Sequence, residues 1–285
     1  MQNYKSYITT VMNKLKINKL TLFSTIFILI FSSCSQYQKL LKSNDYNLKF
    51  EKAVEYYQKK DFDRALSLFE DLTTVFRGTQ RAEEVDYYYA YCTYYTGDVL
   101  MAAYYFDKFY KTYPLSKHTE ECEFMAAYCL YEYSPSPDLD QTYTHKAINH
   151  FQLFLTHYPQ TQLKDSVNHL ITHLNHKLET KAFNNAKLYL MLGHYKAAIV
   201  ALKNVLQDYP NTSYREDILF NILKSGILLA KNSIEKKKYQ RYNNTIGYYY
   251  DLIDQFPNTK YKKEAQKIYK EASKYIENSD KPQKT

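Results

Sequence analysis

A short motif recurs five times along the chain and marks the ends of predicted helices. Each copy is an aromatic residue followed by Pro (Arg in the first copy), any residue, and Ser or Thr. An apolar residue lies seven positions before each aromatic, and Ala or Thr lies four positions before that. These spacings fall on one stripe of an α-helix, which Pro then ends while Ser or Thr caps the next helix. The copies occupy residues 76–79, 113–116, 158–161, 209–212 and 256–259.

A second helix is predicted upstream of each motif, because that segment also repeats. Residues 83–94 recur 37 positions later as residues 120–131, with the same Glu-Glu start and the same Ala-Tyr-Cys centre. Gly97 and Gly193 fall between the two helices of their repeats, where Lys60 takes the place in the first repeat. This arrangement is similar to the tetratricopeptide repeat, in which stacked helix pairs share a continuous core. We therefore predict an all-α solenoid of five helix pairs plus a C-terminal capping helix.

The motif positions also set the expected boundaries. Residues 46–161 hold repeats one to three, residues 162–276 hold repeats four and five with the capping helix, and residues 277–285 form a flexible tail. Leu163 to Leu192 carries leucines at helical spacing and predicts one extended helix.

The first 33 residues have the layout of a secretory signal. Lysines precede an apolar run over residues 20–31, which Ser32-Ser33-Cys34 follows. Two small residues before a cysteine resemble the bacterial lipobox, so we predict cleavage before Cys34, acylation of its thiol, and a lipidated tether over residues 34–45. With Ser35 next, the resemblance favours the periplasmic face of the outer membrane. A plain signal with an incidental cysteine, or a short membrane anchor, are the alternatives, and Met12 is an alternative start to Met1.

Composition fits a helical protein with a contact role. The chain has 33 Tyr and 15 Phe but no Trp, and its 5 Gly and 7 Pro are few for a turn-rich β fold. Tyrosine suits half-buried helix faces and binding surfaces because its ring is apolar and its hydroxyl polar. Of the net charge of +8, four charges belong to lysines of the leader. The remaining charge of +4 is too small for the basic surface that nucleic-acid binding needs, so we exclude nucleic acid as a partner.

No pattern in the sequence indicates catalysis, a metal or a cofactor. Phosphate loops, nucleophile elbows and paired Cys-x-x-Cys motifs are absent. His169, His173 and His176 share one helical face, but no acidic residue at matching spacing completes a metal site, so an exposed face is expected. The Glu-Glu pairs at residues 83–84 and 120–121 are expected at helix starts, where the helix dipole favours carboxylates.

Three further cysteines lie in helical segments. Cys122 and Cys129 are seven residues apart on one helix, which is too far for a disulfide. We expect buried free thiols, with a disulfide from Cys92 to one of the other two as the alternative.

An aromatic groove is predicted along the first three repeats. Counting from the small residue of each first helix places aromatic side chains on the expected concave face of repeats one to three. We expect the tyrosines of this set in repeats two and three to expose their hydroxyl and part of their ring to an extended peptide, although core packing is the alternative for any single ring. The set is Phe50, Tyr57, Tyr87, Tyr91, Tyr94, Phe124, Tyr128 and Tyr131.

Several segments together resemble a known family. The lipobox Cys34, residues 36–43, residues 52–57, the first motif at 76–79 and the five repeats resemble the BamD family of outer membrane assembly lipoproteins, in its Bacteroidetes form. The resemblance covers residues 34–276.

The resemblance implies a non-catalytic subunit of the β-barrel assembly machine. Its N-terminal repeats would receive unfolded outer-membrane β-barrel proteins through an aromatic-ending C-terminal signal. Its C-terminal repeats would dock on the POTRA domains of BamA, and other lipoproteins of the machine would be further partners. There are two alternative hypotheses for the function: a tetratricopeptide adaptor for peptidoglycan enzymes or glycan uptake, and a hydrolase that uses the histidines.

Overall fold

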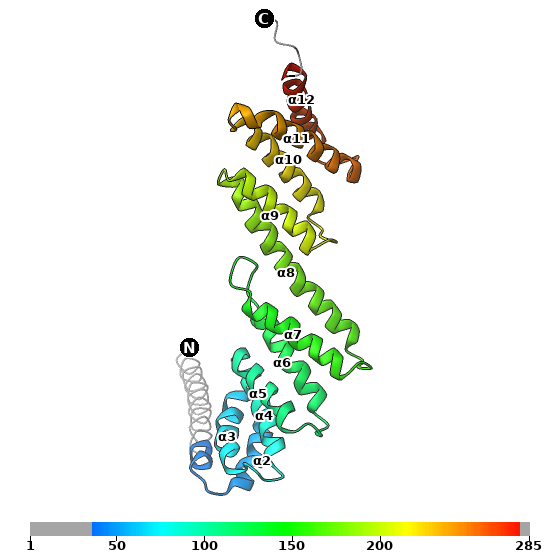
Figure 1. The fold of residues 1–285 in the computed structure, drawn as a ribbon. Helices are drawn as coiled ribbons and strands as arrows, with labels where there is room; N and C mark the ends of the chain where they lie inside the picture. The colour runs from blue at the N-terminus through cyan, green and yellow to red at the C-terminus, as the bar shows by residue number, and fades with distance from the viewer. Residues whose placement is uncertain (1–35, 280–285) are drawn as a thin grey trace, which may run out of the picture. The chain divides into compact units, whose positions relative to one another are not determined.

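Residues 36–279 are described by a computed structural model and form only helices and connecting turns. They divide into two compact units, which we call the N-terminal unit (to Glu132) and the C-terminal unit (from Tyr133). The division falls inside the predicted third repeat. In the N-terminal unit, a short helix over residues 36–41 precedes α2 (Tyr46–Gln58), α3 (Phe62–Val75), α4 (Ala82–Tyr95), α5 (Val99–Thr112) and α6 (Thr119–Tyr133) (Figure 1).

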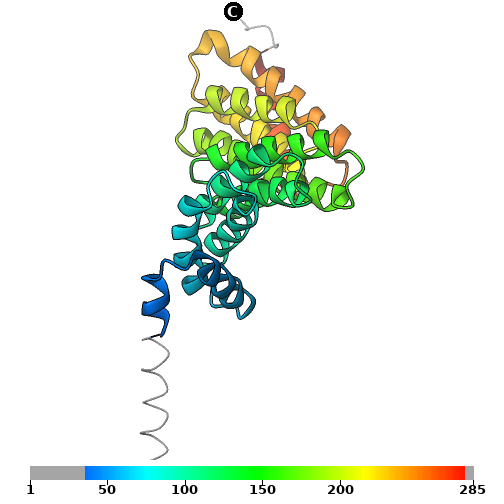
Figure 2. The same cartoon turned by 90° about the horizontal axis from the view of Figure 1, so that it is seen from below.

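The C-terminal unit continues the same alternation of helices. It holds α7 (Thr142–His157), α8 (Lys164–Met191), α9 (Tyr195–Asp208), α10 (Arg215–Lys231), α11 (Glu235–Gln255) and α12 (Lys262–Ser279). From α7 to α12 each helix packs against the next, and Figures 1 and 2 show these helices as a stack of antiparallel pairs. The predicted all-α fold of tetratricopeptide type is therefore confirmed, and the described helices follow one another in the predicted order. The predicted extended helix is α8, whereas α12 takes in the first three residues of the predicted tail.

The recurring motif ends the second helix of each pair, as predicted. In all five copies the aromatic residue follows the last helical residue, and its N–H still donates to the carbonyl four residues back. The N–H of the Ser or Thr then donates to the carbonyl of that aromatic residue. The expected helix cap is different in detail, because the hydroxyl lies three residues before the next helix. In the last four copies the hydroxyl oxygen instead accepts a hydrogen bond from the N–H two residues later, as Thr212 does from Tyr214, and this bond shapes the turn.

The turn inside the first, second and fourth helix pairs depends on one residue with left-handed backbone conformation. Gly97 (φ 93°) and Gly193 (φ 79°) follow α4 and α8, and Lys60 (φ 61°) takes the equivalent place after α2. In each case the N–H donates to the carbonyl three residues back. Lys60 therefore has the same backbone conformation as the two glycines with which it aligns in the sequence.

The predicted apolar stripe forms the core of the repeats. Ala65, Ala102, Ala147, Ala198 and Thr245, at the small-residue position, have no exposed surface. At the larger position the residues of the first four repeats are equally buried, but Tyr249 of the fifth is only half-buried. The second helices therefore face the core with the side the motif predicts.

The predicted tether is in part a docked helix. Tyr37, Leu40 and Leu41 of the short helix over residues 36–41 pack against the core of α2 and α3. The Tyr37 hydroxyl donates to the carbonyl of Arg64 at 3.2 Å. Residues 1–35, and with them the predicted signal and Cys34, lie outside the described part of the chain. Within residues 36–279, no helix combines the length and the apolar character needed to span a membrane.

Candidate functional site

A tyrosine-lined hollow opens in the N-terminal unit. Tyr57 of α2 and Tyr87 and Tyr88 of α4 line it, and their rings meet edge to face with centroids 4.9 Å and 5.6 Å apart. The hollow has a volume of about 630 Å³. Its polar lining comes from the turn between α3 and α4, from the start of α4, and from the turn before α6: Gln80, Glu83, Glu84, Lys117 and His118.

A carboxylate of α6 holds the tyrosines of α4 in place. Glu121 accepts hydrogen bonds from the hydroxyls of Tyr87, at 3.2 Å, and of Tyr91. His118 stacks on the Tyr87 ring at 4.1 Å, and its Nδ1 lies 3.4 Å from Glu121. Burial, followed by the nearby charge of Glu121, raises the pKa of Tyr87 above its usual value. The wall of the hollow is therefore neutral tyrosine rings backed by a carboxylate.

Two of the predicted groove residues belong to the core instead. Tyr91 is 7% exposed and Phe50 is 8% exposed. The Tyr91 ring packs edge-on against Phe106 of α5 at 4.9 Å, and Phe50 packs against Phe69 of α3 at 6.1 Å. The expectation that Tyr91 shows part of its ring to solvent is wrong, because this face of α4 is covered by α5.

Four more of the predicted residues are half-buried: Tyr94 on α4, and Phe124, Tyr128 and Tyr131 on α6. Phe124, Tyr128 and Tyr131 stack in succession along α6, with ring centroids 5.7 Å and 5.8 Å apart. Burial raises the pKa of Tyr94 and Tyr128, with Glu132 beside both hydroxyls adding to the effect. The structure therefore brings Tyr57 and Tyr87 into the hollow. Phe124, Tyr128 and Tyr131 form a separate aromatic row on α6, and Tyr94 of α4 lies near it beside the same carboxylate, that of Glu132.

The sequence count missed several members of the site. Tyr88 lines the hollow although the count skipped it, and His118 and Lys117 come from the turn before α6. The run Tyr87-Tyr88-Tyr89 could have indicated that Tyr88 also lies at the site, because three consecutive helical residues cannot share one face. Tyr89 indeed lies apart, with its hydroxyl 3.4 Å from that of Tyr105. No sequence signal pointed to the turn before α6.

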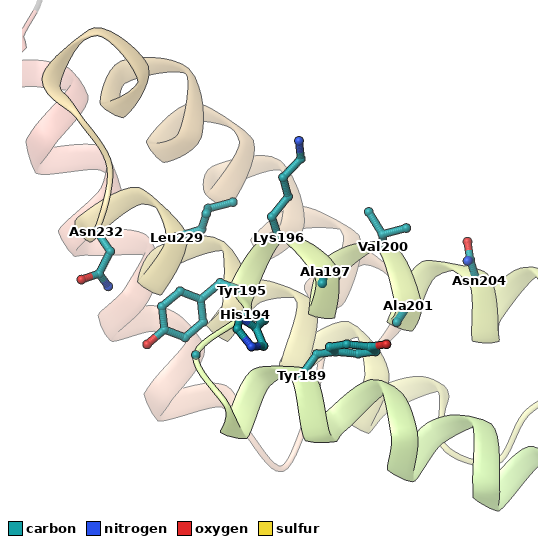
Figure 3. A pocket seen from close by; sticks show the side chains of 11 residues that line it. Tyr189, His194, Tyr195, Lys196, Ala197, Val200, Ala201, Asn204, Leu229 and Asn232 are labelled. Carbon is teal, nitrogen blue, oxygen red and sulfur yellow. The ribbon is translucent and has the colours of Figure 1, made fainter.

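A second, more apolar hollow lies in the C-terminal unit. Its volume is about 990 Å³, and side chains of α8, α9 and α10 line it (Figure 3). Tyr189 and Val200 face it from α8 and α9 with 44% and 53% of their surface exposed. Met191 and Leu192 at the end of α8 are even more exposed, at 74% and 60%. We call the exposed Tyr189 and Val200 in the wall of this hollow the apolar surface, and Met191 and Leu192 do not line the hollow.

The remaining candidates for chemistry have structural surroundings. Cys92, Cys122 and Cys129 are free and buried, which confirms the expected thiols and leaves no disulfide at Cys92. The Glu-Glu pairs lie in the first turns of α4 and α6, as predicted, and Glu83 also accepts a hydrogen bond from the Ser116 hydroxyl at 2.6 Å.

The histidines of α8 lie on its exposed side, as the sequence suggested. His169, His173 and His176 are all exposed, and His176 stacks on Tyr214 with ring centroids 5.7 Å apart. Across residues 36–279 no group of three or more His, Cys, Asp or Glu side chains is placed to hold a metal ion.

Comparison with known proteins identifies relatives of the chain. An Aquifex aeolicus protein assigned as outer membrane protein assembly factor BamD is 25% identical over 211 residues, which cover 72% of this chain and 67% of that protein. The outer membrane protein assembly factor BamD of Caulobacter vibrioides is 24% identical over 131 residues, which cover 46% of this chain and 43% of the relative. The second match thus spans less than half of that relative.

Solved structures similar to the chain are helical-repeat proteins. The TPR2AB domain of yeast Sti1 is 13% identical with a TM-score of 0.38, and the comparison covers 80% of this chain and 98% of that one. A thermophilic tetratricopeptide protein of Thermus thermophilus is 15% identical with a TM-score of 0.32, at the same coverage. Both are too distant to bear on function.

The family comparison is more specific than these neighbours. Residues 43–242 match the YfiO family, described as outer membrane lipoprotein. That span takes in the first four helix pairs and reaches into α11. Because it covers well over half of the chain, the chain belongs to the YfiO family of outer membrane lipoproteins, the family of the BamD-type assembly factors.

Proposed function

We propose that the chain is a lipid-anchored subunit of the β-barrel assembly machine on the periplasmic face of the outer membrane. The family match over residues 43–242 is the observation that carries the proposal. The names of the Aquifex and Caulobacter relatives support it. The Bacteroidetes type remains a prediction.

The hollow of the N-terminal unit is proposed to receive unfolded outer-membrane proteins. Tyr57, Tyr87 and Tyr88 offer ring surface for aromatic side chains, and Glu84 at the rim offers an exposed carboxylate to main-chain N–H groups of an extended segment. The aromatic row of Phe124, Tyr128 and Tyr131 on α6, with Tyr94 of α4, is proposed to extend the contact. Phe50 and Tyr91 support the surface from the core and do not contact the peptide.

The C-terminal unit is proposed to dock on the POTRA domains of BamA. Its hollow, with the apolar surface of Tyr189 and Val200, is larger and less polar than the N-terminal hollow, and exposed apolar surface of this kind can mark a protein interaction site. A binding role accounts for both surfaces, and no step of the proposal needs catalysis, a cofactor or a nucleic acid. Other lipoproteins of the machine are further candidate partners.

Affinity purification from detergent-solubilised outer membrane tests the proposal. Full-length protein should co-purify with BamA, and Val200→Asp on the apolar surface should weaken that association while the protein stays folded. A matched control is Leu115→Asp, which changes a 99% exposed residue of the N-terminal unit. Recovery of peptidoglycan enzymes or glycan-uptake proteins without BamA would instead favour the hypothesis that the chain is an adaptor for those proteins.

Peptide titration tests the client surface separately. A peptide with an aromatic-ending barrel signal should bind roughly 5- to 100-fold more weakly to Tyr57→Ala and Tyr87→Ala, the range expected for aromatic contact residues. Tyr104→Ala serves as control, because Tyr104 is 56% exposed on α5 and lies outside the hollow. Equal affinity of all three variants would show that the hollow does not bind this peptide.

A further inference from the structure

The first described helix fixes where a lipid at Cys34 would enter the membrane. That helix begins at residue 36, and two residues of extended chain span at most about 7 Å. Two hydrogen bonds fix this helix against the repeats. The Tyr37 hydroxyl donates to the Arg64 carbonyl, and the Lys49 ammonium donates to the Leu41 carbonyl at 3.0 Å. An acylated Cys34 would therefore keep this end of the N-terminal unit at the lipid headgroups.

A basic hollow lies beside this helix. Its volume is about 610 Å³, and its charged lining comprises the cations of Lys39, Lys52, Lys59 and Arg64 and the carboxylates of Glu55 and Asp61. We call this surface the basic face. Its net charge is +2, although the leader lysines are not part of it.

Within the lining itself, the ion pairs leave this excess of two cations. Glu55 is shared by Lys52 and Lys59, each with its ammonium 2.6 Å from a carboxylate oxygen. Arg64 is paired with Asp61 at 3.0 Å. One carboxylate thus serves two lysines, and these side chains are substantially exposed, so an external anion can approach them.

An apolar side chain accompanies the cations. Leu48 of α2 is 41% exposed and lines the same hollow, and Leu40 of the docked helix lines it as well. Exposed leucine among lysines is the composition of surfaces that lie at a membrane interface, where the apolar group enters the headgroup layer and the cations meet phosphate.

We propose that the basic face rests on the phosphate headgroups of anionic phospholipids in the membrane that the Cys34 lipid enters. Lys39 lies on the docked helix only about 5 Å along its axis from residue 36, so it stays within about 12 Å of Cys34. The contact would set the orientation of the N-terminal unit above the membrane, in addition to the anchor that holds it there. The inference rests on the proposed acylation of Cys34, and its test separates the two.

The first arm uses the lipidated protein in vesicles. Leu48→Cys can be labelled with an environment-sensitive fluorophore, because Cys92, Cys122 and Cys129 are buried. In phosphatidylcholine vesicles that contain phosphatidylglycerol, we expect blue-shifted emission and quenching by lipid-borne quenchers. High salt or pure phosphatidylcholine should reduce both. The same water-like emission in all vesicles would overturn the proposal.

The second arm removes the anchor. The mature chain with Cys34→Ser is sedimented with the same vesicles, and Lys39→Gln, Lys52→Gln and Lys59→Gln are combined in one variant. Each lysine near an anionic surface contributes about fivefold in binding, so the combined variant should bind at least about tenfold more weakly. A charge-matched control combines Lys263→Gln, Lys267→Gln and Lys270→Gln, which are exposed on α12, and should bind as well as the parent.

The outcomes distinguish the possible sources of the anion. Equal losses in the two triple variants would show unspecific charge attraction and overturn the basic face. Displacement by excess inorganic phosphate at constant ionic strength would assign the surface to a soluble anion and overturn the membrane contact. If the unlipidated protein behaves as expected while the Cys34 chain carries no lipid, the basic face stands and the proposed acylation fails.

Discussion

The ammonium group of Lys49 lies 2.5 Å from the carboxylate of Asp71, and the same nitrogen lies 3.0 Å from the carbonyl of Leu41. Lys49 is 1% exposed, whereas the Asp71 side chain is 48% exposed. One buried cation of α2 therefore joins α3 to the end of the docked helix. This pair explains why the segment after the proposed lipid anchor is held against the repeats.

The two partners of this pair should respond unequally to substitution. Lys49→Met keeps most of the buried stem and leaves Asp71 hydrated, so it should cost about 1–2 kcal/mol, the value of a lost buried hydrogen bond. Asp71→Ala leaves the buried ammonium with only the Leu41 carbonyl and the Tyr46 ring and should cost roughly 3 kcal/mol. Urea unfolding of both variants measures the difference. If Lys49→Met loses as much stability as Asp71→Ala or more, the ion pair itself, rather than the cost of an unpaired buried charge, determines the effect.

Tyr91 should behave as a core residue. Because it is 7% exposed and packs on Phe106, Tyr91→Ala should destabilise the N-terminal unit by about 3–5 kcal/mol, like Phe106→Ala. Tyr104→Ala, at a 56% exposed position, should change stability by less than about 1 kcal/mol. Thermal melts of the three variants test this, and a Tyr91→Ala protein as stable as Tyr104→Ala would contradict the packing described.

The chain reversals were predictable from sequence because their causes are local. An aromatic residue before Pro, followed by Ser or Thr, ends a helix and forms a turn through hydrogen bonds within a few residues. The same locality made the left-handed position of Lys60 readable by alignment with Gly97 and Gly193.

The site was only partly predictable because its contacts are not local. Counting along α4 treats the helix as having one covered face, but α4 packs against both α3 and α5. The ring of Tyr91 is covered by Phe106, and its hydroxyl reaches Glu121, 30 residues away. Such a pairing depends on how one repeat stacks on the next, which spacing within a helix cannot reveal. The docking of residues 36–41 escaped prediction for the same reason, since its hydrogen bonds reach Lys49 and Arg64, which lie farther along the chain.

Two glycines of the C-terminal unit should respond to alanine in opposite directions. A Cβ on Gly226 of α10 would lie 2.9 Å from the Tyr248 ring of α11, so Gly226→Ala should destabilise by about 1–3 kcal/mol. A Cβ on Gly247 of α11 meets nothing within 4 Å, so Gly247→Ala should stabilise by about 0.5–1 kcal/mol through helix propensity. Urea unfolding monitored by circular dichroism compares them. Similar effects of the two substitutions would show that α10 and α11 do not approach this closely.

The stability of the N-terminal unit should fall as pH rises above 9. Burial raises the pKa of Cys92 and of Cys129 from 9.0 to about 12, and it raises that of Cys122 in the same direction. Above pH 9 the unfolded chain releases thiol protons that the folded chain keeps, so the free energy of unfolding falls with each pH unit. The pKa of Tyr57 and of Tyr87 is also raised by burial, so the fall should steepen above pH 10.

Urea unfolding between pH 7 and pH 11 measures this dependence, and one substitution assigns it. Each raised group contributes at most about 1.4 kcal/mol per pH unit, and between pH 9 and 10 the three thiols dominate. Cys129→Val should therefore reduce the slope in that interval by about a third, with little change below pH 8. Its thiol and the other two should also resist a disulfide reagent until urea unfolds the protein, because all three are buried. A slope that is flat to pH 10, or thiols that react in the folded protein, would place the cysteines at the surface rather than in the core.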